Sequence, residues 1–199
     1  MKNQINIIER AKSSLFFLSF KNLSLSFNNK QIFSDISFDI VYNRILLIKG
    51  PVGAGKSSFL KLLAGFIDAQ TGLFIHLHNN NPVKSIYLHS QAEFNFMTGY
   101  VNDEILISGG DIGDFSEYAG RSIYDLSGGE LKKLSIMIAA SSEESCVMLL
   151  DEPLDMLDDN EAASMASFII ERSKTRPFII ATHDNHFDDI ADVIIEIHR

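Results

Sequence analysis

The chain has 199 residues, of which 46% are hydrophobic and 22% charged, a composition typical of one soluble domain with enough residues for a substantial core. Its formal net charge of −9, from 17 basic and 26 acidic residues, disfavours a dedicated nucleic-acid-binding surface. The single cysteine, Cys146, excludes an internal disulfide bond and is expected to be a buried small hydrophobic residue. No apolar run approaches the roughly 18 residues of a membrane span, and residues 14–20 form too short a run for a secretory signal.

The first predicted elements are antiparallel strands. Residues 15–48 contain short segments rich in Phe, Ile and Leu, such as "FFLSFKNLSLSF" and "IFSDISFDI", in which apolar and polar residues partly alternate. Residues 1–14 carry a weaker pattern, so we expect them to be a loosely attached extension of one domain that covers residues 15–199.

A strand, a glycine-rich loop and a helix follow next. The apolar run "RILLIKG" precedes "GPVGAGKSS", which fits the pattern G-x-x-x-x-G-K-[ST], and the helical pattern "SSFLKLLAGF" comes after it. The glycines allow the backbone N–H groups to surround phosphates, while Lys56 would reach the β- and γ-phosphates and the Ser57 hydroxyl would bind Mg²⁺. The predicted phosphate-binding residues are Gly50, Pro51, Val52, Gly53, Ala54, Gly55, Lys56, Ser57 and Ser58.

The second half of the chain alternates helices with apolar strands. A turn at residues 79–82 is followed by a weakly patterned stretch that we expect to form a small, partly helical insertion. After residue 126 the pattern predicts a helix, the strand "CVMLLDE", a helix over about 160–173, the strand "PFIIATHD", a helix or turn, and the strand "DVIIEI". This order predicts an α/β fold with a mostly parallel sheet covered on both faces.

Two further groups of polar residues follow predicted strands. Asp151 ends the run "VMLLD" and is expected to hold Mg²⁺, and Glu152 beside it is a candidate general base that polarises the attacking water. His183 follows the strand "FIIAT", at the edge where open α/β sheets bind ligands, and would contact the γ-phosphate or the water. His76 and His78 lie on one strand face without a nearby carboxylate or Cys pattern, so no metal site is expected there.

The segment "LSGGELKK" combines a helix cap with two glycines. Ser127 and Glu130 have the spacing of a capping box, which predicts that a helix begins here. Glycine in a first helical turn costs roughly 1 kcal/mol relative to alanine, so Gly128 and Gly129 need a separate reason. Close approach of an anion to the backbone at the positive end of the helix provides one, with a glycine-tolerant cap as the alternative.

Together these motifs resemble the nucleotide-binding domain of ATP-binding cassette (ABC) ATPases, from about residue 15 to the end of the chain. "GPVGAGKS" is similar to the family's Walker A motif, "LSGGE" to its signature motif, "VMLLDE" to its Walker B motif with the catalytic glutamate, and "ATHD" to its switch histidine. The resemblance implies a P-loop NTPase core with an N-terminal antiparallel β subdomain, ATP and Mg²⁺ as ligands, and Glu152, His183 and Lys56 as catalytic residues.

The same resemblance suggests roles for three more residues. Phe27 matches the aromatic residue that stacks on adenine, with a strand core residue as the alternative. Gln91 matches the glutamine that contacts Mg²⁺, so the implied metal ligands are Ser57, Gln91 and Asp151. Asp158 matches the loop after Walker B that crosses to the opposite subunit, although Asp155 stands where the family often has serine.

In this family two domains pair head to tail. The resemblance therefore implies a homodimer in which Ser127, Gly128 and Gly129 of one chain contact the γ-phosphate held by residues 50–57 of the other. The helical subdomain of the family corresponds to about residues 92–140 and is short in this chain, which leaves its coupling to a membrane partner open.

Two classes of function remain. The chain resembles small stand-alone ATPase subunits of bacterial transporters, among them the haem exporter of cytochrome c maturation, which act with an integral membrane permease on the cytoplasmic face of the inner membrane. The apolar residues Phe94, Phe96, Met97 and Tyr100 would form the docking surface, or instead the core of the small subdomain. The alternative is a soluble ABC ATPase of an assembly machine, such as the one for iron-sulfur clusters. The stretch "ELKK" resembles the signature helix of the iron-sulfur cluster assembly ATPase.

Overall fold

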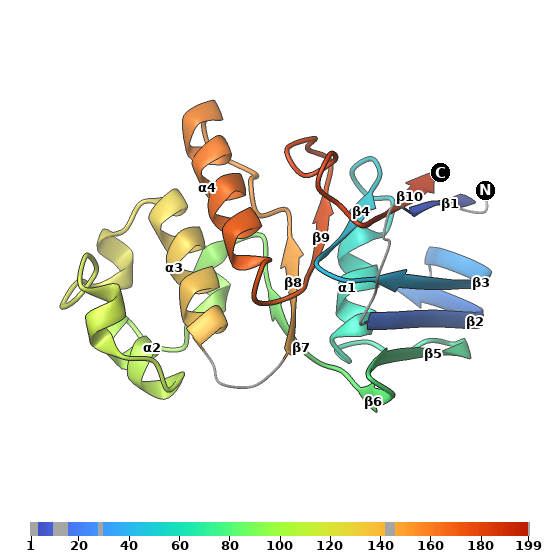
Figure 1. Ribbon diagram of the computed structural model, residues 1–199, viewed down its shortest axis with the longest axis horizontal. Coiled ribbons are helices and arrows are strands. Elements are labelled where there is room, and N and C mark those ends of the chain that lie inside the picture. The colour runs from blue at the N-terminus through green and yellow to red at the C-terminus, as the bar shows by residue number, and fades with distance from the viewer. Residues whose placement is uncertain (1–3, 10–15, 28–29, 142–145, 199) are drawn as a thin grey trace.

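The computed structural model describes residues 4–9, 16–27, 30–141 and 146–198, which form two sheets and the helices packed on them (Figure 1). Figure 1 shows the four-stranded sheet near the two termini and the helices α2 and α3 at the opposite end of the molecule. The strands are β1 (Gln4–Glu9), β2 (Phe16–Phe27), β3 (Lys30–Tyr42), β4 (Ile45–Lys49), β5 (Thr71–His78), β6 (Asn81–Pro82), β7 (Lys84–Leu88), β8 (Cys146–Asp151), β9 (Phe178–Thr182) and β10 (Val193–His198). The α-helices are α1 (Lys56–Leu63), α2 (Val101–Ile107), α3 (Gly128–Ser141) and α4 (Asp159–Arg172).

The larger sheet has the strand order β1-β10-β4-β9-β8-β7 and is parallel except for β1, which pairs antiparallel with β10. Its central strands β4, β8 and β9 are almost entirely apolar and buried, as expected for a parallel sheet covered on both faces. The carboxyl ends of β4, β8 and β9 lie at one edge of this sheet, and the residues that follow them carry the predicted motifs.

Alternate residues of the central strands face two separate cores. In β4, Leu46 and Ile48 belong to the core that also contains α1 and the antiparallel sheet. Ile45 and Leu47 belong to the core formed with α3 and α4. Helix α1 therefore lies against one face of the larger sheet and α3 against the other, which follows from the two-residue period of a strand.

The smaller sheet has the order β3-β2-β5-β6 and is antiparallel. The alternation in residues 15–48 predicted the antiparallel strands β2 and β3, whereas β5 and β6 lie beyond that stretch. Phe20 of β2 packs against Phe59 of α1 with ring centroids 5.1 Å apart, so this sheet is fixed to the helix that follows the glycine-rich loop. In β5, His76 Nε2 lies 2.7 Å from the hydroxyl of buried Tyr42, and burial lowers the pKa of His76 to about 4.

The segment between β7 and β8 forms a small helical unit with its own core. It contains α2, the first part of α3, and single 3₁₀ turns at Ala92–Asn95, Ile112–Phe115 and Ile123–Asp125. Val101, Ile105, Leu131 and Leu134 are buried in a third hydrophobic cluster. The predicted small, partly helical insertion is therefore present, while its assignment to about residues 92–140 stays a prediction.

The structure differs from the sequence-based expectation at the N-terminus. Residues Gln4–Glu9 were expected to be loosely attached, yet they form an edge strand along β10, with Ile5 and Ile7 packed on the first core. Alternating isoleucines bury one face of the added strand, which is the physical reason for the pairing. Residues 1–3 and 10–14 lie outside the described part of the chain, and the boundary at residue 15 stays a prediction.

The remaining elements follow the prediction closely. Helix α4 begins at Asp159, the strands at 146–151, 178–182 and 193–198 are present, and a turn over residues 186–190 connects the last two. Cys146 is buried, as expected. Within the described residues, no helix is both long enough and apolar enough to span a bilayer.

Candidate nucleotide-binding site

The glycine-rich loop between β4 and α1 has a backbone that only glycine accommodates at two positions. Gly50 has φ +152°, and a Cβ there would lie 2.5 Å from the carbonyl oxygen of Ile197 in β10. Gly55 has φ +105°, and a Cβ there would lie 2.4 Å from Ile32 Cγ2. Both glycines are therefore required by close packing as well as by backbone conformation, which fixes the loop at the carboxyl edge of the sheet.

Lys56, the first residue of α1, is buried and reaches across the loop. Its Nζ donates to the carbonyl oxygen of Gly50 at 2.8 Å and forms an ion pair with Glu152 Oε1 at 3.0 Å. A buried ammonium group needs such partners because leaving it unpaired in a low-dielectric site is costly. The ammonium group of Lys56 is thus placed at the mouth of the loop, with a carboxylate as its counter-ion.

Asp151, at the end of β8, accepts hydrogen bonds from two hydroxyl groups. Ser57 Oγ donates to Oδ1 at 3.0 Å, and the hydroxyl of Tyr87 in β7 donates to Oδ2 at 2.9 Å. Burial, followed by the charge of Asp151, raises the pKa of Tyr87. One carboxylate and one hydroxyl side by side form the kind of oxygen ligand set that Mg²⁺ uses when phosphates and water complete its octahedron.

Glu152 lies between the loop and the end of β9. Its Oε2 is 3.0 Å from His183 Nδ1, while Oε1 pairs with Lys56, so the carboxylate joins a cation on one side to an imidazole on the other. Glu152 has φ +48°, a conformation that is uncommon for residues other than glycine and is often found at functional sites. The backbone strain and the two contacts together fix this carboxylate at the carboxyl edge of the sheet.

Lys132 connects helix α3 to the segment after β8. Its side chain is buried, and Nζ donates to the carbonyl oxygens of Asp155 and of Glu152, the latter at 3.4 Å. Burial lowers the pKa of Lys132 from its ordinary value. The helix that begins with the "LSGG" segment is therefore joined, within one chain, to the backbone of the candidate base.

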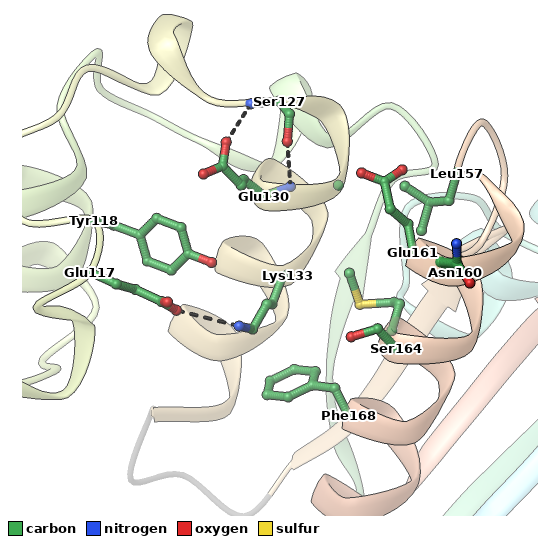
Figure 2. Close-up of a pocket in the computed structure, with 12 residues that line it drawn as sticks. Glu117, Tyr118, Ser127, Glu130, Lys133, Leu157, Asn160, Glu161, Ser164 and Phe168 are labelled. Carbon is green, nitrogen blue, oxygen red and sulfur yellow. Dashed lines mark hydrogen bonds and ion pairs between the residues drawn. The ribbon is translucent and has the colours of Figure 1, made fainter.

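Figure 2 shows the start of α3, where the predicted capping box is confirmed. The backbone N–H of Ser127 donates to Glu130 Oε2 at 2.8 Å, and that of Glu130 donates to Ser127 Oγ at 3.2 Å. Among the described residues, a Cβ on Gly128 would meet no atom within 4 Å, whereas one on Gly129 would lie 3.3 Å from Glu161 Oε1. Packing within the chain thus gives a reason for glycine at position 129 but none at position 128.

A cavity of about 470 Å³ separates the first turns of α3 and α4 (Figure 2). Its walls include Gly129 and Glu130 of α3, Glu161 of α4, and an ion pair between Lys133 and Glu117 at 3.4 Å. Asp158 caps α4 by accepting from the N–H groups of Asn160 and Glu161, each at 2.9 Å. The "LSGG" segment and the Asp158 loop consequently adjoin each other, on the face of the sheet opposite to α1.

Gln91 and Phe27, like the other residues named from the resemblance, remain predicted ligand contacts. Gln91 is exposed at the start of a 3₁₀ turn, and its backbone N–H donates to His89 Nδ1 at 3.0 Å. Phe27 ends β2, where its backbone pairs with Lys30, and its side chain lies outside the described part of the structure. Neither finding tests a contact with magnesium or adenine.

Three contacts were missed by the sequence analysis. Tyr87 approaches Asp151 because β7 and β8 are neighbours, which the chain order alone does not reveal. Lys132 lies on a helix and Arg121 in a loop, and no local sequence pattern predicts how these two segments pack against their partners. The clearest available signal was Lys132, a charged residue between the apolar positions Leu131 and Leu134 of the helix.

An apolar surface follows Gln91. Phe94 and Met97 are 72% and 81% exposed, and Tyr100 is 60% exposed. Phe96 instead packs partly against the core of the small helical unit. One side chain of this run therefore joins the core and the other three are exposed, two of them, Phe94 and Met97, at a groove of about 510 Å³. Docking of a partner on these residues stays a prediction.

Comparison with known proteins identifies relatives that match most of the chain. The family model described as "ABC transporter" matches residues 33–155. An uncharacterised ABC transporter ATP-binding protein of Methanocaldococcus jannaschii is 30% identical over 200 aligned residues, which cover 86% of this chain and 78% of the relative. A taurine import ATP-binding protein of Jannaschia sp. is 26% identical, covering 83% of this chain and 71% of that protein. The structure of CbiO1 from Clostridium perfringens, part of the CbiONQ transporter complex, matches with a TM-score of 0.71 at 17% identity, over 94% and 86% of the two chains, which shows the shared fold.

Proposed function

The chain belongs to the ABC transporter family, and from this premise we propose that it binds and hydrolyses MgATP at the interface of a head-to-tail dimer to drive a membrane permease. The observation that carries the proposal is the row of contacts from Lys56 through Glu152 to His183, beside the pair formed by Ser57 and Asp151. These groups lie at the carboxyl edge of the larger sheet, where α/β folds bind their ligands.

The loop residues bind and orient the phosphates. The backbone of residues 50–55 supplies N–H groups around the phosphates, and Lys56 supplies a cation for the β- and γ-phosphates. For Lys56 to contact a phosphate, its ion pair with Glu152 has to open, because the same ammonium group serves both anions. Binding of ATP therefore frees one oxygen of the Glu152 carboxylate for the attacking water.

Magnesium would be held by Ser57 and Asp151, with Gln91 as a third candidate, and when bound it neutralises charge on the β- and γ-phosphates. Tyr87 keeps the Asp151 carboxylate oriented by a hydrogen bond to the oxygen that Ser57 does not contact. A single carboxylate suits this metal, since phosphate oxygens and water supply the remaining ligands.

Glu152 acts as the general base, and His183 orients it. The carboxylate would accept a proton from the water that attacks the γ-phosphate. His183 lies 3.0 Å from the Glu152 oxygen that Lys56 does not contact, so it remains a partner of the carboxylate after the ion pair opens. His183 is itself exposed and can contact the γ-phosphate across the mouth of the loop.

The signature segment acts on the nucleotide of the other chain. Ser127 and Gly128 are exposed, and the first turn of α3 presents backbone N–H groups together with the positive end of the helix dipole. A Cβ on Gly128 would face open space among the described residues, which leaves room for close approach by a second molecule. Asp158 and Met156, which is 92% exposed, lie in the adjoining loop that would reach the same partner.

The permease is proposed to dock on the surface formed by Phe94, Met97 and Tyr100. These side chains combine exposure with a neighbouring groove, a combination typical of protein interfaces. They follow Gln91 directly, so docking would be transmitted to the nucleotide site through that residue. If the chain docks on a permease in this way, its proposed location is the cytoplasmic face of the inner membrane.

The transporter proposal is favoured over a soluble assembly ATPase. The relatives reported above carry transporter names, and the exposed aromatic surface suits an apolar partner. Haem export remains a hypothesis for the transported substrate, motivated by the small size of the chain. Isolating the membrane protein that co-purifies with the chain would test it: a permease of another substrate class would contradict haem export.

Replacing Glu152 by Gln tests the proposed chemistry. The amide keeps the shape of the side chain but cannot accept the proton, so hydrolysis should fall by about 100-fold or more while an ATP-bound dimer accumulates. The readouts are phosphate release and the molecular mass of the chain with and without MgATP. Unchanged turnover would show that another residue is the base, and the matched control Glu171→Gln changes an exposed carboxylate on α4.

A further inference from the structure

The signature turn carries a negative charge where it is proposed to meet a phosphate. Glu130 lies in the first turn of α3, and its carboxylate accepts a hydrogen bond from the backbone N–H of Ser127 at 2.8 Å. A carboxylate so close to a phosphate-binding turn should repel ATP of the partner subunit. The Glu130 side chain that caps the first turn of α3 therefore also places a negative charge where the phosphate is proposed to bind.

Arg121 is the cation that contacts this carboxylate. Its Nη1 donates to Glu130 Oε1 at 2.9 Å, while Nη2 donates to the carbonyl oxygen of Asp125, also at 2.9 Å. The guanidinium group thus joins the loop before the signature to the first turn of α3. Arg121 and the Ser127 cap together lower the pKa of Glu130 to about 2, because both donate hydrogen bonds that stabilise the ionised carboxylate.

The other charged groups of this surface do not provide the same compensation. Glu161 lies 3.3 Å from the position of a Cβ on Gly129, and Asp158 begins the neighbouring helix, so both add negative charge. Lys133, on the same helix, instead pairs with Glu117 at 3.4 Å (Figure 2). Arg121 is therefore the cation in contact with the cap itself.

We propose that Arg121 is a positioning residue for ATP binding across the dimer interface: it neutralises Glu130 so that Ser127 and Gly128 can meet the γ-phosphate held by the partner subunit. The inference rests on the proposed head-to-tail dimer and adds a residue that none of the four motifs contains. Arg121 acts through Glu130 and does not touch the nucleotide.

A purely structural role for Arg121 makes a different prediction. If the guanidinium group only holds its loop against α3, its loss should impair dimerisation equally with a charged or a neutral side chain at position 130. If it acts by neutralisation, removing the charge of Glu130 should remove the need for Arg121. The neutral variant Glu130→Gln keeps an oxygen that can accept from Ser127, so it separates the two roles.

The experiment measures ATP-driven dimerisation in the Glu152→Gln background, with molecular mass recorded over a range of MgATP concentrations. Arg121→Ala should raise the ATP concentration for half-maximal dimerisation by about tenfold or more, because an unpaired carboxylate then faces each of the two phosphates. Adding Glu130→Gln to Arg121→Ala should restore that concentration to within about threefold of the background protein, and the control Lys133→Ala should leave it unchanged within the same range.

Each outcome is decisive. Dimerisation that is insensitive to Arg121→Ala, or a defect that Glu130→Gln fails to rescue, overturns the inference while leaving the proposed function intact. If the Glu152→Gln protein itself does not dimerise with ATP, the proposed function fails and the inference fails with it. Thermal unfolding and ATP binding by the monomer check that Arg121→Ala is folded; should it not fold, Arg121→Gln provides the same loss of charge with a side chain that still donates hydrogen bonds.

Discussion

The glycine-rich loop and the "LSGG" segment both contain glycines at the start of a helix, but their surroundings differ completely. Around Gly50 and Gly55 the chain itself leaves no room for a side chain, and Lys56 and Ser57 already contact Glu152 and Asp151 at the end of β8. Around Gly128 there is open space among the described residues, and Ser127 is hydrogen-bonded to Glu130 in the first turn of its own helix.

This difference separates two halves of the proposed site. For the half at the loop, the fold already brings Lys56, Asp151, Glu152 and His183 together within one chain. The half at the signature lies on the opposite face of the sheet from α1, and in the proposal it binds the nucleotide of the other chain. Changes in the first half should therefore alter the monomer, and changes in the second should alter only the dimer.

The largest expected effect comes from Lys56→Met, which keeps the buried aliphatic stem and removes the charge. ATP binding by the monomer should weaken by about tenfold or more, and hydrolysis should fall below detection, because the phosphates lose their principal side-chain cation. Calorimetric titration of the monomer with MgATP measures the affinity. The control Lys61→Met changes the charge in the last turn of the same helix; wild-type affinity in Lys56→Met would remove this lysine from the site.

Ser127→Arg should separate binding from hydrolysis. The long side chain blocks the phosphate of the partner subunit, so hydrolysis should fall by about 100-fold, whereas ATP affinity of the monomer should stay within about twofold. The same titration and a phosphate-release assay provide the two values. A large loss of ATP affinity in the Ser127→Arg monomer would mean that the signature segment contacts the nucleotide of its own chain. The proposed division of the site between two chains would then be wrong.

Tyr87→Phe tests how the metal ligand is held. The variant removes the hydrogen bond to Asp151 Oδ2, so the Mg²⁺ concentration needed for half-maximal ATP binding should rise by about tenfold, since hydrogen bonds to charged groups contribute about 1.5–3 kcal/mol. Titrating magnesium at fixed ATP measures it. Tyr124, which is 83% exposed, offers the matched control Tyr124→Phe, and equal behaviour of the two variants would rule out a role for Tyr87.

Gly128→Ala has the smallest and most informative effect. Alanine is favoured over glycine in a helix by up to about 1 kcal/mol and meets no atom here, so the isolated chain should be slightly more stable while ATP-driven dimerisation weakens. Thermal unfolding and dimer mass report the two quantities. Gly129→Ala should lack the gain in stability, because its Cβ would press against Glu161 and Leu157. Stabilisation without loss of dimerisation would mean that nothing approaches Gly128.

The sequence predicted the first half of the site better than its surroundings. The glycine-rich loop and the carboxylates after an apolar strand have local signatures, because strand, turn and helix chemistry all fall within about ten residues. Tyr87 and Arg121 have none, since their partners lie in segments that only the folded sheet and the small helical unit bring near. The edge strand at Gln4–Glu9 was missed for the same reason: its partner, β10, lies at the other end of the chain.

Mixing two inactive variants tests the central claim most directly. In a head-to-tail dimer of Lys56→Met with Ser127→Arg, one site carries both substitutions and the other carries neither. Hydrolysis should therefore reappear on mixing, up to about a quarter of the wild-type rate if chains pair at random and one intact site suffices. Each variant alone should remain inactive. Mixed dimers that form with ATP yet show no hydrolysis above that of the separate variants would contradict a site shared between two chains.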